Sequence, residues 1–158
     1  MGKIYFNMKN LFVYWLPPLA YMVFIFPTND ALTADSTSLI IVPIIKWLFP
    51  HADEATIEIL HIGIRKCIHF LEYGFLAYLL FRGVRMRNKG WRLKWILFAG
   101  LITIGYGALD EFFQTLIPSR TGSLSDWMID SAGAVVTLLI ITMISFIKMR
   151  KGDAKKAF

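Results

Sequence analysis

Apolar residues occur along the chain in long blocks that charged residues separate. Four blocks, at residues 11–26, 64–81, 93–109 and 127–147, approach the ~20 residues that a helix needs to cross ~30 Å of hydrocarbon. A fifth block, residues 39–49, is too short to cross and contains Pro43 and Lys46, so we expect it to lie along the membrane interface. The pattern predicts an all-α integral membrane protein with four transmembrane helices.

Composition agrees with this pattern. The 158 residues suit a single domain, and a hydrophobic fraction of 56% with a mean hydropathy of +0.55 is too high for an ordinary soluble domain. The first block follows Lys3 and Lys9, which is also the layout of a cleaved signal peptide. No small-residue cleavage site follows Phe26, and membrane helices tolerate prolines such as Pro17 and Pro18, so we expect a retained anchor.

The distribution of charge predicts the topology. The connection at residues 82–94 contains six basic residues and no acid, and the tail at residues 148–158 is also basic. By the positive-inside rule these regions and both termini are cytoplasmic, so residues 27–63 and 110–126 face outside. The net charge of +6 therefore needs no nucleic-acid partner.

Polar residues recur at helical spacing near the outer ends of the last three predicted spans. At ~1.5 Å per residue their ionisable groups lie at one depth, and their spacing places each set on one helix face. Small residues lie on the same faces, at Gly107, Gly133 and Thr137, and indicate close helix contacts. The polar set comprises Lys66, His69, Glu72 and Tyr73; Asp110, Glu111 and Gln114; and Asp126 and Asp130.

The acids of this layer outnumber its bases. The acids are Glu72, Asp110, Glu111, Asp126 and Asp130, and the bases are Arg65, Lys66 and Arg120. Even with His69 protonated, one negative charge is left over, so the layer needs a protonated acid, a bound cation or a cationic ligand group. Because no cysteine or second buried histidine joins His69, we assign no metal site and expect no cofactor.

The combined motif resembles the VanZ-like family of bacterial membrane proteins. It consists of Lys66, His69, Glu72 and Tyr73, then Asp110, Glu111, Gln114, Pro118 and Arg120, then Asp126, Asp130 and Gly133. The resemblance covers residues 64–142, and Ser119 stands where many relatives would have glycine. It implies a single membrane domain over residues 1–158 and a role in the cell envelope on the outer face. The founding relative is associated with resistance to the glycopeptide teicoplanin.

We expect the layer to bind or handle an amphiphile with a phosphate group at the outer leaflet of the bacterial cytoplasmic membrane. The partner would be a membrane lipid or a lipid-linked envelope precursor, with the glycopeptide itself as a second candidate. Arg120 and Lys66 would hold the anion, and the other polar residues would contact the head group or relay protons. The pattern implies no oligomeric state.

Three alternatives stay open. A small membrane enzyme would use His69, Glu72 and Asp110 as catalytic residues in acid–base chemistry on an envelope lipid. An ion-coupled carrier is less favoured, because the inner halves of the spans lack ionisable residues. A structural bundle would use the polar layer only to order its helices, with Asp126 completing a capping box that begins at Ser123.

Overall fold

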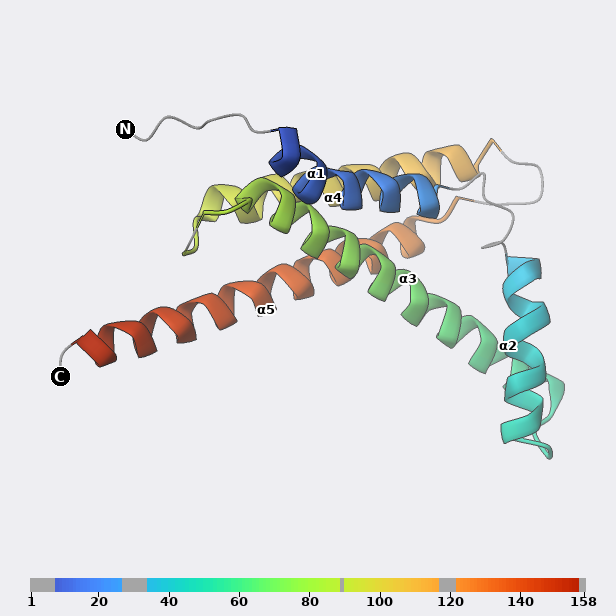
Figure 1. Ribbon diagram of the computed structural model, residues 1–158. Helices are drawn as coiled ribbons and strands as arrows, with labels where there is room; N and C mark the ends of the chain where they lie inside the picture. The colour runs from blue at the N-terminus through green and yellow to red at the C-terminus, as the bar shows by residue number, and fades with distance from the viewer. Residues whose placement is uncertain (1–7, 27–33, 89, 117–121, 157–158) are drawn as a thin grey trace.

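The computed structural model describes residues 8–26, 34–88, 90–116 and 122–156, which form five α-helices and no strand (Figure 1). The predicted all-α fold class is therefore confirmed. The helices are α1 (Met8–Ile25), α2 (Ala34–Leu48), α3 (Glu54–Arg85), α4 (Leu93–Gln114) and α5 (Leu124–Lys156).

Within these described ranges, three helices are long and apolar enough to cross a membrane. They are α3, α4 and the Leu124–Arg150 part of α5. The apolar stretches of α1 and α2 are shorter, at Leu11–Ile25 and Ser38–Leu48. Three of the four predicted spans thus have a full-length helix, and a crossing by α1 stays a prediction.

Helix α3 organises the bundle, because it packs against each of the other four helices, and α4 also packs against α5. Figure 1 shows the start of α1, the α3–α4 connection and the end of α5 at the same end of the molecule. The core lies where α3 meets its neighbours. It comprises Ile25, Tyr73, Leu76, Ala77, Leu80, Phe81, Trp95, Ala99, Ala134 and Leu138.

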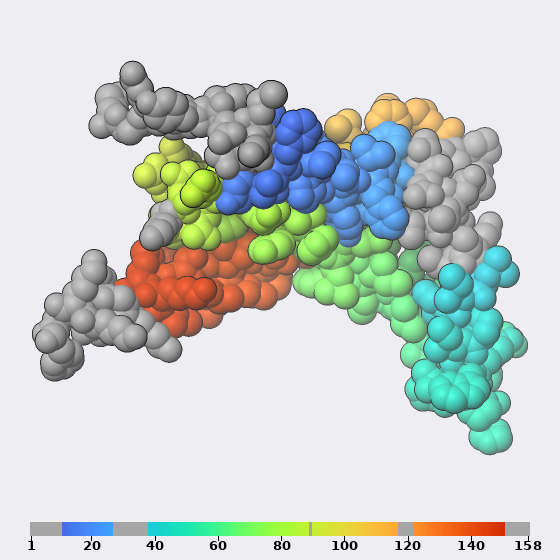
Figure 2. All heavy atoms as spheres, viewed as in Figure 1, coloured from blue at the N-terminus to red at the C-terminus, as the bar shows by residue number. Residues whose placement is uncertain are grey.

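The helices extend beyond the apolar blocks that predicted them. Helix α3 has 32 residues, or ~48 Å at ~1.5 Å per residue, which exceeds the ~30 Å hydrocarbon thickness. Its first turn is capped by Asp53, whose Oδ1 accepts a hydrogen bond of 2.9 Å from the Thr56 N–H. Helix α2 and the start of α3 project from the rest of the bundle (Figure 2). The polarity of residues 54–63 therefore marks helix outside the apolar span, not a loop.

Small residues allow α3 and α5 to cross closely. A Cβ atom on Gly74 would lie 2.7 Å from Thr137 Oγ1, and one on Gly133 would collide with the backbone carbonyl of Phe70. A Cβ atom on Gly107 of α4 would lie 3.2 Å from the ring of Tyr73. The predicted contacts at Gly107, Gly133 and Thr137 are confirmed. This crossing holds the polar faces of α3, α4 and α5 against one another.

Candidate functional site

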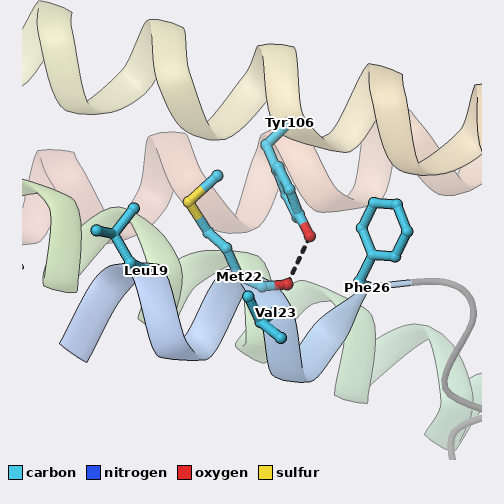
Figure 3. A pocket seen from close by; sticks show the side chains of 5 residues that line it. All are labelled: Leu19, Met22, Val23, Phe26 and Tyr106. Carbon is cyan, nitrogen blue, oxygen red and sulfur yellow. Dashed lines mark hydrogen bonds between the residues drawn. The ribbon is translucent and has the colours of Figure 1, made fainter. Parts of the chain in front are cut away.

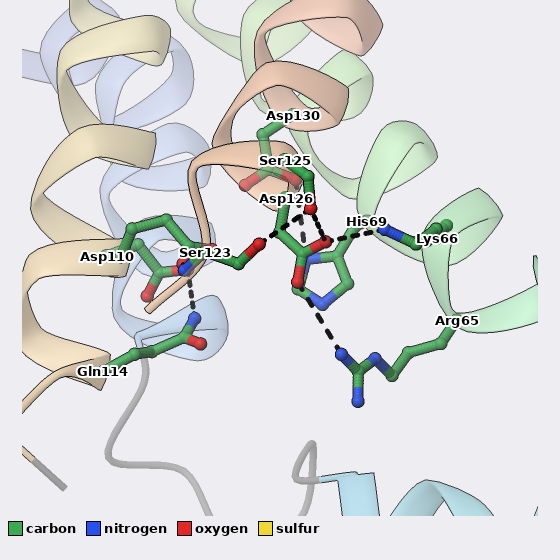
Figure 4. Close-up of polar contacts among 10 residues, drawn as sticks. Arg65, Lys66, His69, Asp110, Gln114, Ser123, Ser125, Asp126 and Asp130 are labelled. Carbon is green, nitrogen blue, oxygen red and sulfur yellow. Dashed lines mark hydrogen bonds and ion pairs between the residues drawn. The ribbon is translucent and has the colours of Figure 1, made fainter. Parts of the chain in front are cut away.

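At the rim of the polar layer nearest the start of α5, two cations from α3 meet one acid of α5. Lys66 Nζ donates a hydrogen bond of 2.9 Å to Asp126 Oδ1, and Arg65 lies 3.7 Å from Asp126 Oδ2 (Figure 4). The side chains of Arg65 and Lys66 are 34% and 39% exposed. Because two positive charges share one carboxylate, this rim has an excess of positive charge at an accessible position.

One helical turn further along α5, Asp130 is 1% exposed. Its Oδ1 lies 3.5 Å from His69 Nδ1, which is an ion-pair distance if the imidazole is protonated. The geometry is not that of a hydrogen bond, and within the described ranges neither carboxylate oxygen of Asp130 has a hydrogen-bond donor. Asp130 is thus a buried acid with one possible counter-charge among the residues that the structure describes.

Asp110 of α4 faces the same interior. Its Oδ2 accepts a hydrogen bond of 2.9 Å from the Tyr73 hydroxyl and one of 3.3 Å from the Gln114 side-chain amide. Its Oδ1 is buried and lacks a hydrogen-bond partner among the residues that the structure describes. Tyr73 and Gln114 therefore act as network partners for one side of this carboxylate only.

Glu111 links α4 to the start of α5. Its Oε2 accepts a hydrogen bond of 2.6 Å from the backbone N–H of Ser123, the residue before α5. In a capping box, an acid three residues after Ser123 would accept that bond. The capping box predicted for Ser123 and Asp126 is therefore wrong: Glu111 takes this position, because Asp126 is drawn sideways to Lys66 and Arg65.

These contacts separate the layer into a cationic rim and an acidic interior. Asp110, Glu111 and Asp130 are 5%, 8% and 1% exposed, and one oxygen of each lies within 4.8 Å of those of the other two. In the described part of the chain, His69 is the one basic group within 4.0 Å of any of these three acids. We call these three residues the acidic cluster.

The remaining predicted site residues are Glu72 and Arg120. Glu72 is partly buried and interacts electrostatically with His69, Asp130 and Asp110. The ion pair of His69 is with Asp130, not with Glu72. Arg120 lies outside the described residues. Arg65 was counted among the bases but not among the site residues, although its position directly before Lys66 on α3 already placed it at this level.

An apolar hollow lies between α1 and α4 (Figure 3). It measures about 430 Å³ and is lined by Leu19, Met22, Val23, Phe26 and Tyr106. The Tyr106 hydroxyl donates a hydrogen bond of 2.6 Å to the Met22 carbonyl oxygen. The ring centroid of Tyr106 lies 6.5 Å from that of Tyr73, the hydrogen-bond donor to Asp110. Two packed tyrosines thus connect the hollow to the acidic cluster.

Long apolar helices around a buried layer of charged side chains define a helical membrane protein with a polar centre between α3, α4 and α5. The family model described as VanZ/LLP1 matches residues 12–146, so the chain belongs to the VanZ/LLP1 family. Comparison with curated proteins and with solved structures found no match. The family resemblance noted from the motif is confirmed, while the function of the individual residues stays a prediction.

Proposed function

We propose that this protein binds the phosphate-bearing head group of a membrane lipid or lipid-linked envelope precursor at the extracytoplasmic face of the bacterial cytoplasmic membrane. By its family resemblance, this binding lowers susceptibility to lipophilic glycopeptides such as teicoplanin. The observation that carries the proposal is the pair of half-buried cations, Arg65 and Lys66, that converge on the single carboxylate of Asp126.

The orientation follows from where the bases lie. Arg82, Arg85, Arg92 and Lys94 flank the α3–α4 connection, and the end of α5 carries Lys148 and Arg150. In Figure 1 these regions share one end of the molecule with the start of α1. With that end in the cytoplasm and α1 crossing the membrane, the chain crosses four times. The rim formed by Arg65, Lys66 and Asp126 then faces outside.

Anion binding follows from charge and exposure. Guanidinium and ammonium groups form strong, charge-assisted hydrogen bonds with phosphate oxygens. Asp126 neutralises one of the two cations, so a bound phosphate monoanion would neutralise the other. The partial exposure of Arg65 and Lys66 leaves room for this contact without dismantling their pairing with Asp126.

The hollow beside Tyr106 suits the hydrocarbon part of the same ligand. It is lined mainly by apolar side chains of α1 and reaches α4 one turn before Asp110. A lipid chain lying there would have its head group near the outer ends of α3, α4 and α5. An amphiphile would thus satisfy both surfaces, whereas a free phosphate ion would use only the rim.

A second candidate function is catalysis on that lipid. The pairing of His69 with Asp130 at 3.5 Å resembles a general base that a carboxylate orients. Glu72 and Asp110 also interact electrostatically with His69 and Asp130. In this alternative the rim would bind the substrate and His69 would exchange protons with it.

The test combines lipid identification with a resistance assay. The protein is purified in mild detergent, bound lipids are identified by mass spectrometry, and teicoplanin susceptibility is measured in cells that produce each variant. We expect the double variant Arg65→Ala and Lys66→Ala to lose the anionic lipid and the protection. The control variant Lys94→Ala, at the opposite end of the bundle, should keep both.

Equal lipid binding and equal protection by the double variant, at normal protein levels, would contradict the proposal. Catalysis is tested separately with His69→Ala and profiling of the envelope lipids. If that variant abolishes protection and shifts the abundance of one lipid species, the protein is an enzyme. If protection is lost with an unchanged lipid profile, the enzyme alternative is excluded.

A further inference from the structure

We propose that Asp110, Glu111 and Asp130 bind a divalent metal cation between α4 and α5, where the charge count from the sequence allowed a bound cation but we assigned no metal site. The first observation is geometric: one carboxylate oxygen from each residue lies within 4.8 Å of those from the other two. Two ligands of one ion lie no farther apart than twice the metal–oxygen distance, which is about 4.8 Å for Ca²⁺ and about 4.2 Å for Mg²⁺. The 4.8 Å limit equals the value for Ca²⁺ and exceeds the value for Mg²⁺, so Ca²⁺ is the better match and Mg²⁺ would require the oxygens to move closer.

The second observation concerns hydrogen bonding and is independent of that spacing. Asp130 is 1% exposed, and neither of its carboxylate oxygens accepts a hydrogen bond within the described ranges. Its Oδ1 lies 3.5 Å from His69 Nδ1, while its Oδ2 has no hydrogen-bond donor there, so Asp130 offers a buried acceptor oxygen that is not in use. Asp110 Oδ1 and Glu111 Oε1 are also buried without a donor, whereas the second oxygen of each is satisfied by Tyr73 and Ser123 respectively.

This division of roles is what metal binding requires. Ligating carboxylates are usually oriented by hydrogen bonds to the oxygen that does not bind the metal. Tyr73 and Ser123 orient two of the three carboxylates in this way and leave their free oxygens buried. Three like charges held this close repel one another, and an ion of charge +2 bound between them would remove most of that repulsion.

The donor set indicates the class of ion. All three ligands are carboxylate oxygens, which hard cations such as Ca²⁺, Mg²⁺ and Mn²⁺ prefer, while zinc sites are built mainly from cysteine and histidine. Three protein ligands leave further coordination positions for water or for an oxygen atom of a bound ligand. The cations at the rim do not compete, because Arg65 and Lys66 are paired with Asp126.

The inference is independent of the lipid proposal and is tested with the metal alone. The protein is purified in dodecyl maltoside, stripped with EDTA, and titrated with Ca²⁺ and with Mg²⁺ by isothermal titration calorimetry. We expect saturable binding of one ion per chain and a higher thermal unfolding temperature with the metal. Loss of an outer-shell partner typically weakens metal binding about 10–100-fold, so Asp130→Asn and Glu111→Gln should each lose at least about tenfold in affinity.

A control variant separates this site from other acids. The matched control is Glu58→Gln, which changes an exposed acid of α3 and should bind the ion as the unaltered protein does. The proposal is overturned if the unaltered protein binds neither ion at millimolar concentration, or if Asp130→Asn binds as tightly. It is also overturned if only Arg120→Ala binds the ion, because Arg120 would then be the counter-charge of the cluster.

Discussion

Glu111 Oε2 accepts a hydrogen bond of 2.6 Å from the backbone N–H of Ser123, so a side chain of α4 satisfies the start of α5. The bond joins residues twelve positions apart across the α4–α5 connection. It places a carboxylate at the positive end of the α5 dipole, which is a favourable position for negative charge. The same residue contributes its other oxygen to the acidic cluster.

Removal of this acceptor should destabilise the protein, whereas an isosteric amide should not. Glu111→Ala loses the acceptor for the Ser123 N–H at a cost of about 1–2 kcal/mol, and about 1 kcal/mol corresponds to a shift of about 2–4 °C in melting temperature. Glu111→Gln keeps an acceptor oxygen and loses one of three mutually repelling charges, so its melting temperature should be close to that of the unaltered protein. Thermal unfolding in detergent with EDTA measures both. Equal losses for the two variants would show that the charge matters and not the cap.

The close crossing of α3 and α5 should depend on Gly133. Gly133→Ala places a methyl group against the Phe70 carbonyl, so the two helices must separate. Overpacking of this kind costs about 1–3 kcal/mol, and we expect a lower melting temperature together with loss of the site. Gly105→Ala is the matched control, because a Cβ there meets nothing within 4 Å. Similar melting temperatures for the two variants would mean that the crossing is looser than described.

The hydroxyl of the tyrosine that donates to Asp110 should contribute more to stability than the hydroxyl of an exposed tyrosine on the same helix. Tyr73→Phe removes the hydroxyl that donates to Asp110 Oδ2 at 2.9 Å and leaves that buried oxygen with the weaker 3.3 Å bond from Gln114. A buried group left unsatisfied costs about 1–3 kcal/mol. Tyr78→Phe, whose residue is 44% exposed, serves as the control in the same unfolding assay. An unchanged stability of Tyr73→Phe would place this hydroxyl outside the network.

The proposed orientation predicts which positions react from outside the cell. In a background with Cys67→Ser, we expect Glu58→Cys to react with a membrane-impermeant maleimide in intact cells. Arg87→Cys, in the basic α3–α4 connection, should react only after the membrane is permeabilised. Gel-shift detection of the labelled protein measures both. The reverse pattern would place the polar layer in the cytoplasm and contradict the proposed contact with envelope lipids.

Much of the architecture was predictable because it depends on local patterns. Apolar block length predicted the helices that became α3, α4 and α5, and helical spacing placed Lys66, His69 and Tyr73 on the face that meets the other helices. Small residues such as Gly133 predicted where the helices approach closely, since a missing side chain has the same effect in any helix pair. Helix ends were less predictable, because polar residues such as Glu54 and Glu58 continue a helix beyond its apolar span.

Pairing within the layer was not predictable in the same way. The sequence showed an excess of acids but not that Arg65 and Lys66 both pair with Asp126. Among the described residues, this pairing leaves His69 as the counter-charge of the acidic cluster. The capping box predicted from Ser123 and Asp126 was wrong, because the Ser123 N–H donates its hydrogen bond to Glu111 of another helix.

The sequence by itself thus determined which residues form each helix and which side chains share a helix face, because each residue rotates by ~100° about the helix axis. Which acid meets which base followed from the crossing of the helices, where displacements of about 1 Å separate a hydrogen bond from a mere neighbour. That crossing is set by contacts between residues far apart in the chain, such as Gly133 with Phe70 and Gly107 with Tyr73. A one-dimensional pattern holds no such distances, so the acidic cluster emerged only once the three helices were packed together.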